Sequence, residues 1–313
     1  MSTAILRTTH GWYVQTGSGA AQIATSAVST AELLADREAI ATAAADAQTK
    51  PVESLEVLSP VTTPCRVVAQ MTNYASHARD AGFNPAAVPL TFFRKASGSI
   101  NGPYNDIVKP AHVRLLDYEV EIGLVIGRTM PVGTDLDETN MADYIAGLVV
   151  TNDVSARDVQ LPKTQFYESK SYPTFTPVGP ILVLLDADEL KRFSDLRLRL
   201  TVNGDVRQDS IAGEDIIYPP LRALQTLTAF QHLDAGDLVL TGTPVGTALS
   251  APPKPIQLLA SLLPTDLRWN LFFSSQSRNR NYLRDGDFVE STVATDDGAI
   301  DLGAQRARVR YQP

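Results

Sequence analysis

Cysteine is nearly absent from this sequence of 313 residues, which contains only Cys65. An internal disulfide needs two cysteines, and Cys65 also lacks a second cysteine at the spacing of a metal-binding pair. The sequence therefore excludes an internal disulfide and a zinc site built from cysteines. We expect Cys65 to be a small core residue in a protein of a reducing compartment.

Long hydrophobic runs are also missing. The longest apolar stretches, such as Ile145–Val150 and Ile181–Leu185, are far shorter than the roughly 20 residues that a membrane-spanning helix requires. The first residues show no basic segment followed by a sustained apolar stretch, which a secretory signal would have. We therefore expect no membrane partner and a cytoplasmic location.

Positive charge is in short supply, because 35 Asp and Glu outnumber 27 Lys and Arg and leave a net charge of −8. A phosphate backbone would on balance be repelled, so nucleic acid is not expected as a partner. Hydrophobic residues make up 44% of the chain, which is enough for one large domain and a smaller one. The composition thus indicates a globular protein that folds unaided.

The local sequence pattern changes near residue 65. The first part combines short strand-like pieces with an alanine-rich helical run: Gly11–Gln15, Ala21–Ile23 and Thr30–Ala47. Proline, serine and threonine then dominate Val52–Pro64, which is typical of a connector. We predict a small N-terminal α/β domain with its connector at residues 1–64 and a larger domain at residues 65–313.

The larger domain is predicted to consist mostly of β-strands. Runs of β-branched and apolar residues recur between Gly, Pro and Asp turns, whereas helical signals are few. The predicted strands are Arg66–Met71, Glu119–Ile126, Tyr144–Thr151, Ile181–Leu185, Leu196–Val202, Leu238–Thr241, Phe288–Val293 and Ala307–Tyr311. Strands do not alternate with helices, so the pattern favours an α+β fold, mostly β, with a rolled or barrel-like sheet.

One stretch, Pro252–Tyr282, follows neither the strand nor the helix period. It has proline at one end and a Ser-Arg-Asn-Arg-Asn run at the other. The favoured interpretation is a solvated surface insertion of about residues 252–282. A lid over a site or a contact with another subunit is the alternative.

Acidic residues at every second position mark a candidate metal site. Asp117, Glu119 and Glu121 have the spacing that places side chains on one face of a strand. Crowded carboxylates resist burial unless a cation is present, although a solvated edge is the favoured explanation of a Glu-x-Glu taken alone. Asp153 changes the balance, because it follows the apolar strand that contains Ile145–Val150. Ligands that are all oxygens favour Mg²⁺, Mn²⁺ or Ca²⁺ over zinc.

An ordered set of motifs resembles the fumarylacetoacetate hydrolase family. The motifs are Asn73-Tyr74-Ala-Ser-His77-Ala-Arg-Asp80, Phe93-Arg-Lys95, Asp117-Tyr-Glu119-Val-Glu121, Asn152-Asp153-Val-Ser-Ala-Arg157-Asp158-Val-Gln160, Lys170-Ser-Tyr-Pro-Thr174-Phe, Pro177-Val-Gly179-Pro180, Asn203-Gly204 and Gly236-Asp237 followed by Thr241-Gly242-Thr243-Pro244. The resemblance extends from about Val67 to Gly246, with a weaker tail from Leu283 to Val309. It implies a rolled, mixed β fold around one divalent metal ion.

The resemblance also implies roles for individual residues. It assigns the metal ligands to Glu119, Glu121 and Asp153, the catalytic roles to His77, Asp80 and Lys170, and the substrate-binding roles to Lys95, Arg157, Gln160, Thr174, Gly242 and Thr243. Asp80 stands where many relatives have the longer glutamate, which leaves the reach of a pair with His77 in doubt. Some relatives have a fourth carboxylate ligand near the position of Gln70, so we expect three carboxylates here. A buried Arg157 that pairs with Asp158 is the structural alternative.

The activity implied by the resemblance is hydrolysis of a C–C bond in a 3-acylpyruvate-like 2-oxo acid, with Mg²⁺ or Mn²⁺ and with Ca²⁺ possible. Oxaloacetate decarboxylation and hydration or isomerisation of an unsaturated 2-oxo acid are the alternatives within the family. A metal-stabilised scaffold without activity is disfavoured, because it would not need His77 or Lys170. We also expect a homodimer, and we interpret His10, His112 and His232 as structural or surface residues.

Overall fold

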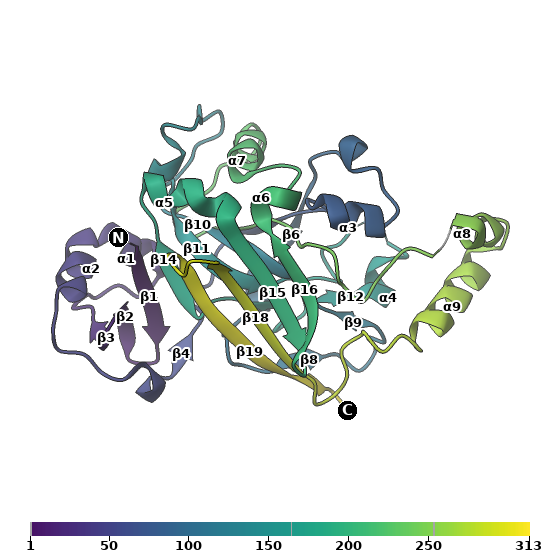
Figure 1. Ribbon diagram of the computed structural model, residues 1–313, viewed down its shortest axis with the longest axis horizontal. Helices are drawn as coiled ribbons and strands as arrows, with labels where there is room; N and C mark the ends of the chain where they lie inside the picture. The colour runs from purple at the N-terminus through teal and green to yellow at the C-terminus, as the bar shows by residue number, and fades with distance from the viewer. Residues whose placement is uncertain (1, 164, 253) are drawn as a thin grey trace.

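Two β-sheets form the centre of the protein in the computed structural model, which describes residues 2–163, 165–252 and 254–313 (Figure 1). The first sheet has ten strands in the order β3 (Gly19–Gln22), β2 (Gly11–Thr16), β1 (Thr3–Thr8), β14 (Ile181–Leu184), β11 (Ile145–Asn152), β10 (Val120–Ile126), β17 (Leu238–Leu240), β5 (Val67–Gln70) and β6 (Phe92–Lys95), with β4 (Val57–Leu58) beside β1. The second sheet has the order β16 (Asp205–Ile211), β15 (Leu196–Val202), β18 (Phe288–Thr295), β19 (Asp301–Tyr311) and β8 (Ile107–Lys109).

Short strand pairs and helices complete the fold. The strand pairs are β9 (Leu116–Asp117) with β12 (Ser155–Ala156) and β7 (Ile100–Asn101) with β13 (Thr176–Pro177). The α-helices are α1 (Thr30–Ala35), α2 (Arg37–Ala44), α3 (Ala75–Asp80), α4 (Arg157–Gln160), α5 (Ala187–Lys191), α6 (Ala212–Asp215), α7 (Pro220–Thr228), α8 (Lys254–Ser261) and α9 (Thr265–Gln276). Single 3₁₀ turns lie at Val52–Ser54, Pro85–Ala87, Ser97–Ser99, Met141–Asp143 and Arg192–Asp195. No helix in the described part of the chain is long and apolar enough to span a membrane.

The hydrophobic core lies on both faces of the first sheet. Along β10, Ile122, Leu124 and Ile126 point toward the second sheet, whereas Val125 joins a cluster on the opposite face. This alternation is what a strand buried on both sides requires. The face that carries Val125 also carries Glu121, four residues earlier, so the polar site lies on the side of the sheet away from the second sheet.

The predicted α+β class, mostly β, is confirmed. Each of the eight predicted strands in residues 65–313 is present, and the largest boundary error is at β19, which begins at Asp301 rather than Ala307. Both sheets are open along the described residues, so neither closes into a barrel. The apolar side chains between the two sheets form one shared core instead.

The N-terminal part continues the first sheet. Strand β1 pairs antiparallel with β14, with Ile5 opposite Leu182. The predicted helical run Thr30–Ala47 is present as two helices that end at Ala44, because Asp36 ends α1 and its side chain accepts a hydrogen bond from the amide of Ala39 at the start of α2. Aspartate favours such a cap over a helix interior. The division of the chain into domains at residue 64 stays a prediction.

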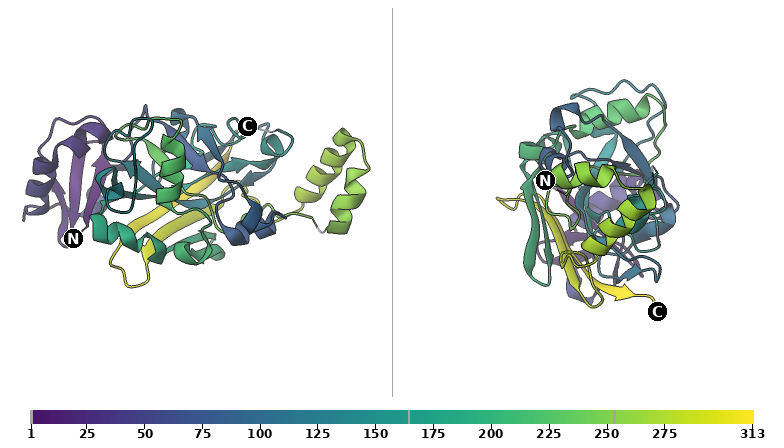
Figure 2. Two further views of the ribbon diagram at one scale, coloured as in Figure 1. Left: turned by 90° about the horizontal axis from the view of Figure 1, so that it is seen from above. Right: turned by 90° about the vertical axis from the view of Figure 1, so that its right-hand side faces the viewer.

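The predicted irregular stretch at residues 252–282 contains two helices, α8 and α9, which we call the helical arm (residues 254–276). The arm extends from one end of the molecule, opposite the N-terminal strands (Figure 2). Its base is held by buried Phe273, whose ring lies 5.1 Å from the guanidinium carbon of Arg114. Residue 253, within the predicted insertion, lies outside the described residues.

Candidate functional site

Three carboxylates meet where β10 begins and β11 ends. Glu119 and Glu121 are two positions apart and share one face, as their spacing predicts. The register of β10 and β11 pairs Val120 with Asn152, and the amide of Asp153 donates to the carbonyl of Glu119 at 2.8 Å. One carboxylate oxygen from each acid lies within 4.8 Å of the others, and all three residues are buried.

Two buried lysines contact this cluster. Lys170 Nζ donates to Glu119 Oε2 at 2.6 Å and to Asp153 Oδ2 at 2.7 Å. Lys95 Nζ donates to Asp153 and, at 2.9 Å, to the carbonyl of Phe175. Burial lowers the pKa of the Lys170 ammonium, but the charges of Asp153 and Glu119 outweigh this effect and raise it. Lys170 therefore stays protonated at neutral pH.

Arg157 joins the cluster to a third buried acid. Its Nε donates to Asp117 Oδ2 at 2.8 Å, one terminal nitrogen donates to Glu119 Oε1 at 2.5 Å, and the other donates to Gln160 Oε1 at 2.8 Å. Asp158 instead accepts hydrogen bonds from two backbone amides at 3.0 and 3.1 Å. Arg157 is therefore buried and paired with a further acid, as the structural alternative held, but that acid is Asp117 and not Asp158.

Asp117 also fixes the point where the chain leaves for the helical arm. Its carboxylate accepts hydrogen bonds from the amide of Ala248 at 2.8 Å and from that of Leu249 at 3.1 Å. Sequence spacing placed Asp117 on the face of the two glutamates, but in the structure it faces Arg157. The reason is that the chain leaves β9 at Asp117 and enters β10 only at Val120, so strand alternation is broken between them.

Glu121 is the acid with the least compensation. Its Oε2 accepts the amide of Gly242 at 2.8 Å, and no lysine or arginine of the described residues forms an ion pair with it. Burial, followed by repulsion from Asp153 and Glu119, raises the pKa of Glu121 well above its ordinary value. Burial also opposes ionisation of Glu119, but Lys170 and Arg157 outweigh it and lower that pKa to about 2.

The charges of the cluster fit a divalent metal ion. Four buried carboxylates share three cationic side chains: Asp117, Glu119, Glu121 and Asp153 with Lys95, Arg157 and Lys170. One net negative charge remains when Glu121 is ionised, and a divalent ion converts it to one net positive charge. Glu119, Glu121 and Asp153 offer the oxygen donors that Mg²⁺ and Mn²⁺ prefer. The residues present therefore fit the ion that the sequence predicted.

We expect metal binding to release a proton. A metal ion and a proton compete for the Glu121 carboxylate, because the pKa of Glu121 is raised when no metal ion is bound. The apparent affinity for Mn²⁺ should therefore fall as the pH falls toward the raised pKa of Glu121. Calorimetry in two buffers with different ionisation enthalpies measures the proton release. The Glu121→Gln variant serves as the comparison, and a wild-type binding enthalpy that is equal in both buffers at pH 6 would contradict the linkage.

A large cavity opens above the cluster, toward the helical arm. Its volume is about 1240 Å³. The predicted site residues that line it are His77, Glu119, Glu121, Arg157, Gln160, Lys170 and Thr243. The predicted site residues that do not line it are Asp80, Lys95, Asp153, Thr174 and Gly242. The structure thus assembles most of the predicted set around one space.

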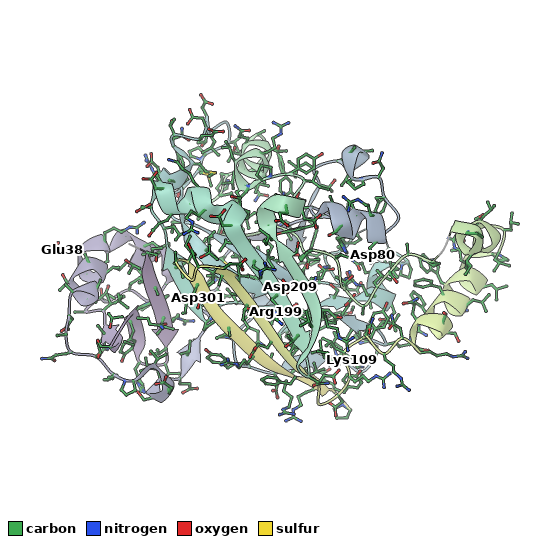
Figure 3. The ribbon with its side chains drawn as sticks, viewed as in Figure 1. Glu38, Asp80, Lys109, Arg199, Asp209 and Asp301 are labelled. Atoms are coloured by element: carbon green, nitrogen blue, oxygen red, sulfur yellow. The ribbon has the colours of Figure 1, made fainter. Side chains whose placement is uncertain are left out.

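His77 lies on α3 and lines the cavity. Its Nδ1 is buried and has no hydrogen-bond partner among the described residues, so the predicted hydrogen bond to Asp80 is not formed. Asp80 ends the helix, on the side of the body from which the arm extends (Figure 3), and its carbonyl accepts the amide of Ala251 at 3.0 Å. Burial lowers the pKa of His77, partly offset by the carboxylate of Glu119. The imidazole is therefore neutral at pH 7 and able to accept a proton.

Three predicted substrate-binding residues have structural contacts. Lys95 is held behind the cluster by Asp153, and the hydroxyl of Thr174 accepts the amide of Val108 at 2.8 Å. Thr243 lines the cavity but donates to the carbonyl of Val120 at 2.9 Å. Direct substrate contact by these three residues stays a prediction.

Gly242 acts through its backbone. It has a φ of +88°, and a Cβ atom there would lie 2.8 Å from Cβ of Asn73. Only glycine fits such a left-handed position so close to another residue. This conformation points the amide of Gly242 at Glu121, which explains the motif without a substrate contact.

Sequence reasoning missed part of the cavity wall. Gln70 is buried, lines the cavity and has no partner for Oε1 among the described residues. Phe93 and Phe166 meet edge to face at 5.6 Å, and Lys170 Nζ lies 5.5 Å from the ring centre of Phe93. Isolated aromatic residues give no local signal of a site. The other three histidines, His10, His112 and His232, lie on the surface as expected.

Comparisons with known proteins identify the family and the fold of the chain. The model of the family described as fumarylacetoacetate (FAA) hydrolase, C-terminal, matches residues 66–310. A fumarylacetoacetate hydrolase domain-containing protein 2 homolog of Dictyostelium discoideum is 34% identical over 216 residues, which cover 66% of this chain and 69% of that protein. The oxaloacetate tautomerase Fahd2a, mitochondrial, of Rattus norvegicus is 34% identical over 204 residues, covering 65% of this chain and 63% of the rat protein.

A solved structure shows the same fold over the full length. It is described as a probable 2-hydroxyhepta-2,4-diene-1,7-dioate isomerase from Mycobacterium abscessus, with a TM-score of 0.75, 28% identity and 100% of both chains covered. The family model spans most of the chain and includes the whole carboxylate cluster. The chain therefore belongs to the fumarylacetoacetate hydrolase family.

Proposed function

We propose that the protein is a metal-dependent hydrolase that cleaves a C–C bond in a 3-acylpyruvate-like 2-oxo acid. The observation that supports this most is the meeting of the carboxylate cluster, Lys170, Arg157 and a neutral His77 around one cavity. A scaffold would need none of the last three in a cavity. The names of the relatives describe enzymes of 2-oxo acids and their enols, which supports a substrate of this kind.

The proposed reaction adds one water molecule and breaks one C–C bond. Water attacks the distal carbonyl of R–CO–CH₂–CO–COO⁻, and the bond between that carbonyl carbon and the CH₂ group breaks. The acyl fragment leaves as the carboxylate R–COO⁻. The electron pair of the broken bond remains on the pyruvate fragment as an enolate, which takes up a proton on carbon to give pyruvate. One proton is released overall.

The side chains of the site supply binding, charge and proton transfer. When bound, Mg²⁺ or Mn²⁺, with Ca²⁺ as a further candidate, supplies the Lewis acidity that makes the enolate a feasible leaving group. Arg157 uses three of its five N–H donors on Asp117, Glu119 and Gln160, so two remain for the substrate carboxylate. The Lys170 ammonium stabilises negative charge on the enolate oxygen. His77 accepts the proton of the attacking water.

The lack of a hydrogen bond between His77 and Asp80 favours a second candidate function, that of a tautomerase. An enzyme that only moves a proton between the keto and enol forms of a 2-oxo acid needs no oriented base for water. The names of the rat and Mycobacterium abscessus proteins, a tautomerase and a probable isomerase, support the same candidate. Oxaloacetate decarboxylation is the remaining alternative, because it forms the same pyruvate enolate.

A substrate panel tests the proposal. Acetylpyruvate, fumarylpyruvate and oxaloacetate would each be incubated with Mg²⁺, Mn²⁺ or a chelator, and pyruvate release would be measured. We expect metal-dependent pyruvate release from an acylpyruvate. Pyruvate from oxaloacetate alone would establish the decarboxylase, and loss of the enol absorbance without pyruvate would establish the tautomerase. If none of these substrates reacts, the result would support a metal-stabilised scaffold without activity.

A homodimer and a cytoplasmic location stay predictions. The family resemblance and the commonness of two-fold oligomers support the dimer. The substrate partner is in each case a small 2-oxo acid.

A further inference from the structure

The helical arm supplies an apolar wall to the cavity that contains the carboxylate cluster. Ile256, Ala260 and Leu263 recur at intervals of four and three residues, which places them on one side of α8 and its end. Trp269 and Phe272 on α9 are three residues apart and line the same cavity. The arm therefore presents a continuous apolar face to this space.

Trp269 and Phe272 are held in place at the base of the arm. The ring of Trp269 stacks on that of buried Phe273, with centres 5.5 Å apart and an angle of 16° between planes. Phe272 packs edge to face against Trp269 at 6.0 Å. Both side chains are partly buried against the main core. Their rings form a fixed surface that a ligand can contact.

Charge is distributed unevenly along the cavity. Glu119, Arg157 and Lys170 lie at the end formed by the first sheet, where they form ion pairs with one another beside Glu121. On the arm side, Arg268 is the one charged residue among the described lining residues, and its guanidinium carbon lies 5.5 Å from the ring centre of Trp269. Recognition of a carboxylate usually combines an arginine with further donors. The arm offers Arg268 among mainly hydrocarbon surfaces.

The size of the cavity also argues against a small, doubly charged substrate. Its volume of about 1240 Å³ exceeds the roughly 300–1,000 Å³ of most small-molecule sites. A four-carbon diacid bound at the carboxylate cluster would leave the apolar wall of the arm in contact with water. A substrate that covers this wall removes its apolar surface from water and gains affinity.

We propose that the arm selects 3-acylpyruvates whose acyl group is large and uncharged, such as an aromatic ring, with Trp269 and Phe272 as the specificity-determining residues. This inference rests on the proposed hydrolase function. The 2-oxo acid head binds at the carboxylate cluster, and the acyl group lies between Trp269 and the body of the protein. A diacid held by Arg268 is the competing occupant, which the experiment separates.

The test compares substrates and arm variants. Wild-type kcat/KM would be measured for benzoylpyruvate, acetylpyruvate and fumarylpyruvate with Mn²⁺, together with Trp269→Ala, Trp269→Phe and Arg268→Gln. We expect benzoylpyruvate to be preferred over fumarylpyruvate by roughly tenfold or more, and Trp269→Ala to lower the ratio of benzoylpyruvate to acetylpyruvate kcat/KM by a similar factor. Trp269→Phe should restore most of this ratio, because it keeps an aromatic ring.

Leu267→Ala is the matched control on the same helix. Leu267 is 46% exposed and does not line the cavity, so this variant should keep the wild-type ratio. A thermal unfolding midpoint for each variant detects damage to the fold. A preference for fumarylpyruvate that is lost roughly 10²-fold in Arg268→Gln and unchanged in Trp269→Ala would overturn the inference in favour of the diacid.

Calorimetric binding separates this inference from the proposed function. Phenylpyruvate and pyruvate would be titrated into the Mn²⁺-loaded wild type and Trp269→Ala. Tighter binding of phenylpyruvate that is lost in Trp269→Ala supports the arm as the binding wall even when no acylpyruvate is cleaved, and the lack of cleavage then refutes only the hydrolase. Equal affinities for the two acids in the wild type would overturn the inference.

Discussion

Replacing Asp153 with asparagine or Glu119 with glutamine is expected to lower kcat/KM by roughly 10³-fold or more, because the loss of a ligand removes several kcal/mol of Lewis-acid stabilisation. The same variants should lose the rise in unfolding temperature that Mg²⁺ or Mn²⁺ gives the wild type. Asp153 lies opposite Glu119 in the extended β10–β11 pairing, so either change removes a third of the carboxylate donor set. Steady-state kinetics and thermal unfolding at several metal concentrations measure both effects.

Asp209→Asn is the matched control for this experiment. Asp209 lies on β16 of the second sheet (Figure 3), where its carboxylate pairs with Arg197 at 2.8 Å. It should leave both the metal-induced stabilisation and the activity unchanged. Metal-induced thermal shifts of wild-type size in both ligand variants would remove Glu119 and Asp153 from the metal site.

Replacing His77 with alanine is expected to lower acylpyruvate cleavage by roughly 10²–10⁴-fold, the usual contribution of a general base. Metal affinity should stay close to that of the wild type, because His77 is not one of the carboxylate donors. Asp80→Asn should be milder, because His77 Nδ1 forms no hydrogen bond with Asp80 within the described residues. Pyruvate release under saturating Mn²⁺ measures the loss for each variant.

The pH profile and a second substrate test whether His77 acts as the general base for the attacking water. Activity that needs neutral His77 falls as the pH drops through the lowered pKa of the imidazole, so the acid limb of kcat/KM should lie below pH 6.5. Oxaloacetate decarboxylation needs no attacking water and should lose less activity in His77→Ala. Lys170→Ala should harm both reactions through the shared enolate. His112→Ala, at the surface, is the control, and a small loss of acylpyruvate cleavage in His77→Ala would show that the base is another group.

Local spacing was sufficient to predict the carboxylate donors. The alternation of Glu119 and Glu121 needs only the two-residue period of a strand, and Asp153 needs only a strand that ends beside it. Eight of the strands β5 to β19 in the larger domain were predictable for a similar reason, since buried strands are apolar and turns interrupt them. These features depend on neighbours in the sequence.

Features that depend on distant contacts were not predictable. Pairing of β1 with β14 joins residues almost 180 positions apart, and no local pattern near Thr3–Thr8 predicts that it pairs with β14. The partner of Arg157 was missed because the irregular step between β9 and β10 turns Asp117 away from the two glutamates. The resemblance implied a pair of His77 and Asp80, but α3 ends at Asp80 and His77 Nδ1 has no hydrogen-bond partner among the described residues.

The carboxylate of Asp117 links two parts of the protein that otherwise have separate tasks. One oxygen pairs with Arg157 beside Glu119, and the two oxygens accept the amides of Ala248 and Leu249, on the segment that leads to the arm. We expect this shared group to couple the two parts, so that a ligand bound against the arm changes the affinity of the carboxylate cluster, and a ligand of the cluster changes binding at the arm by the same factor. A change in the arm that accommodates a new acyl group would therefore have to preserve the hydrogen bonds of Asp117 to Arg157 and to the amides of Ala248 and Leu249.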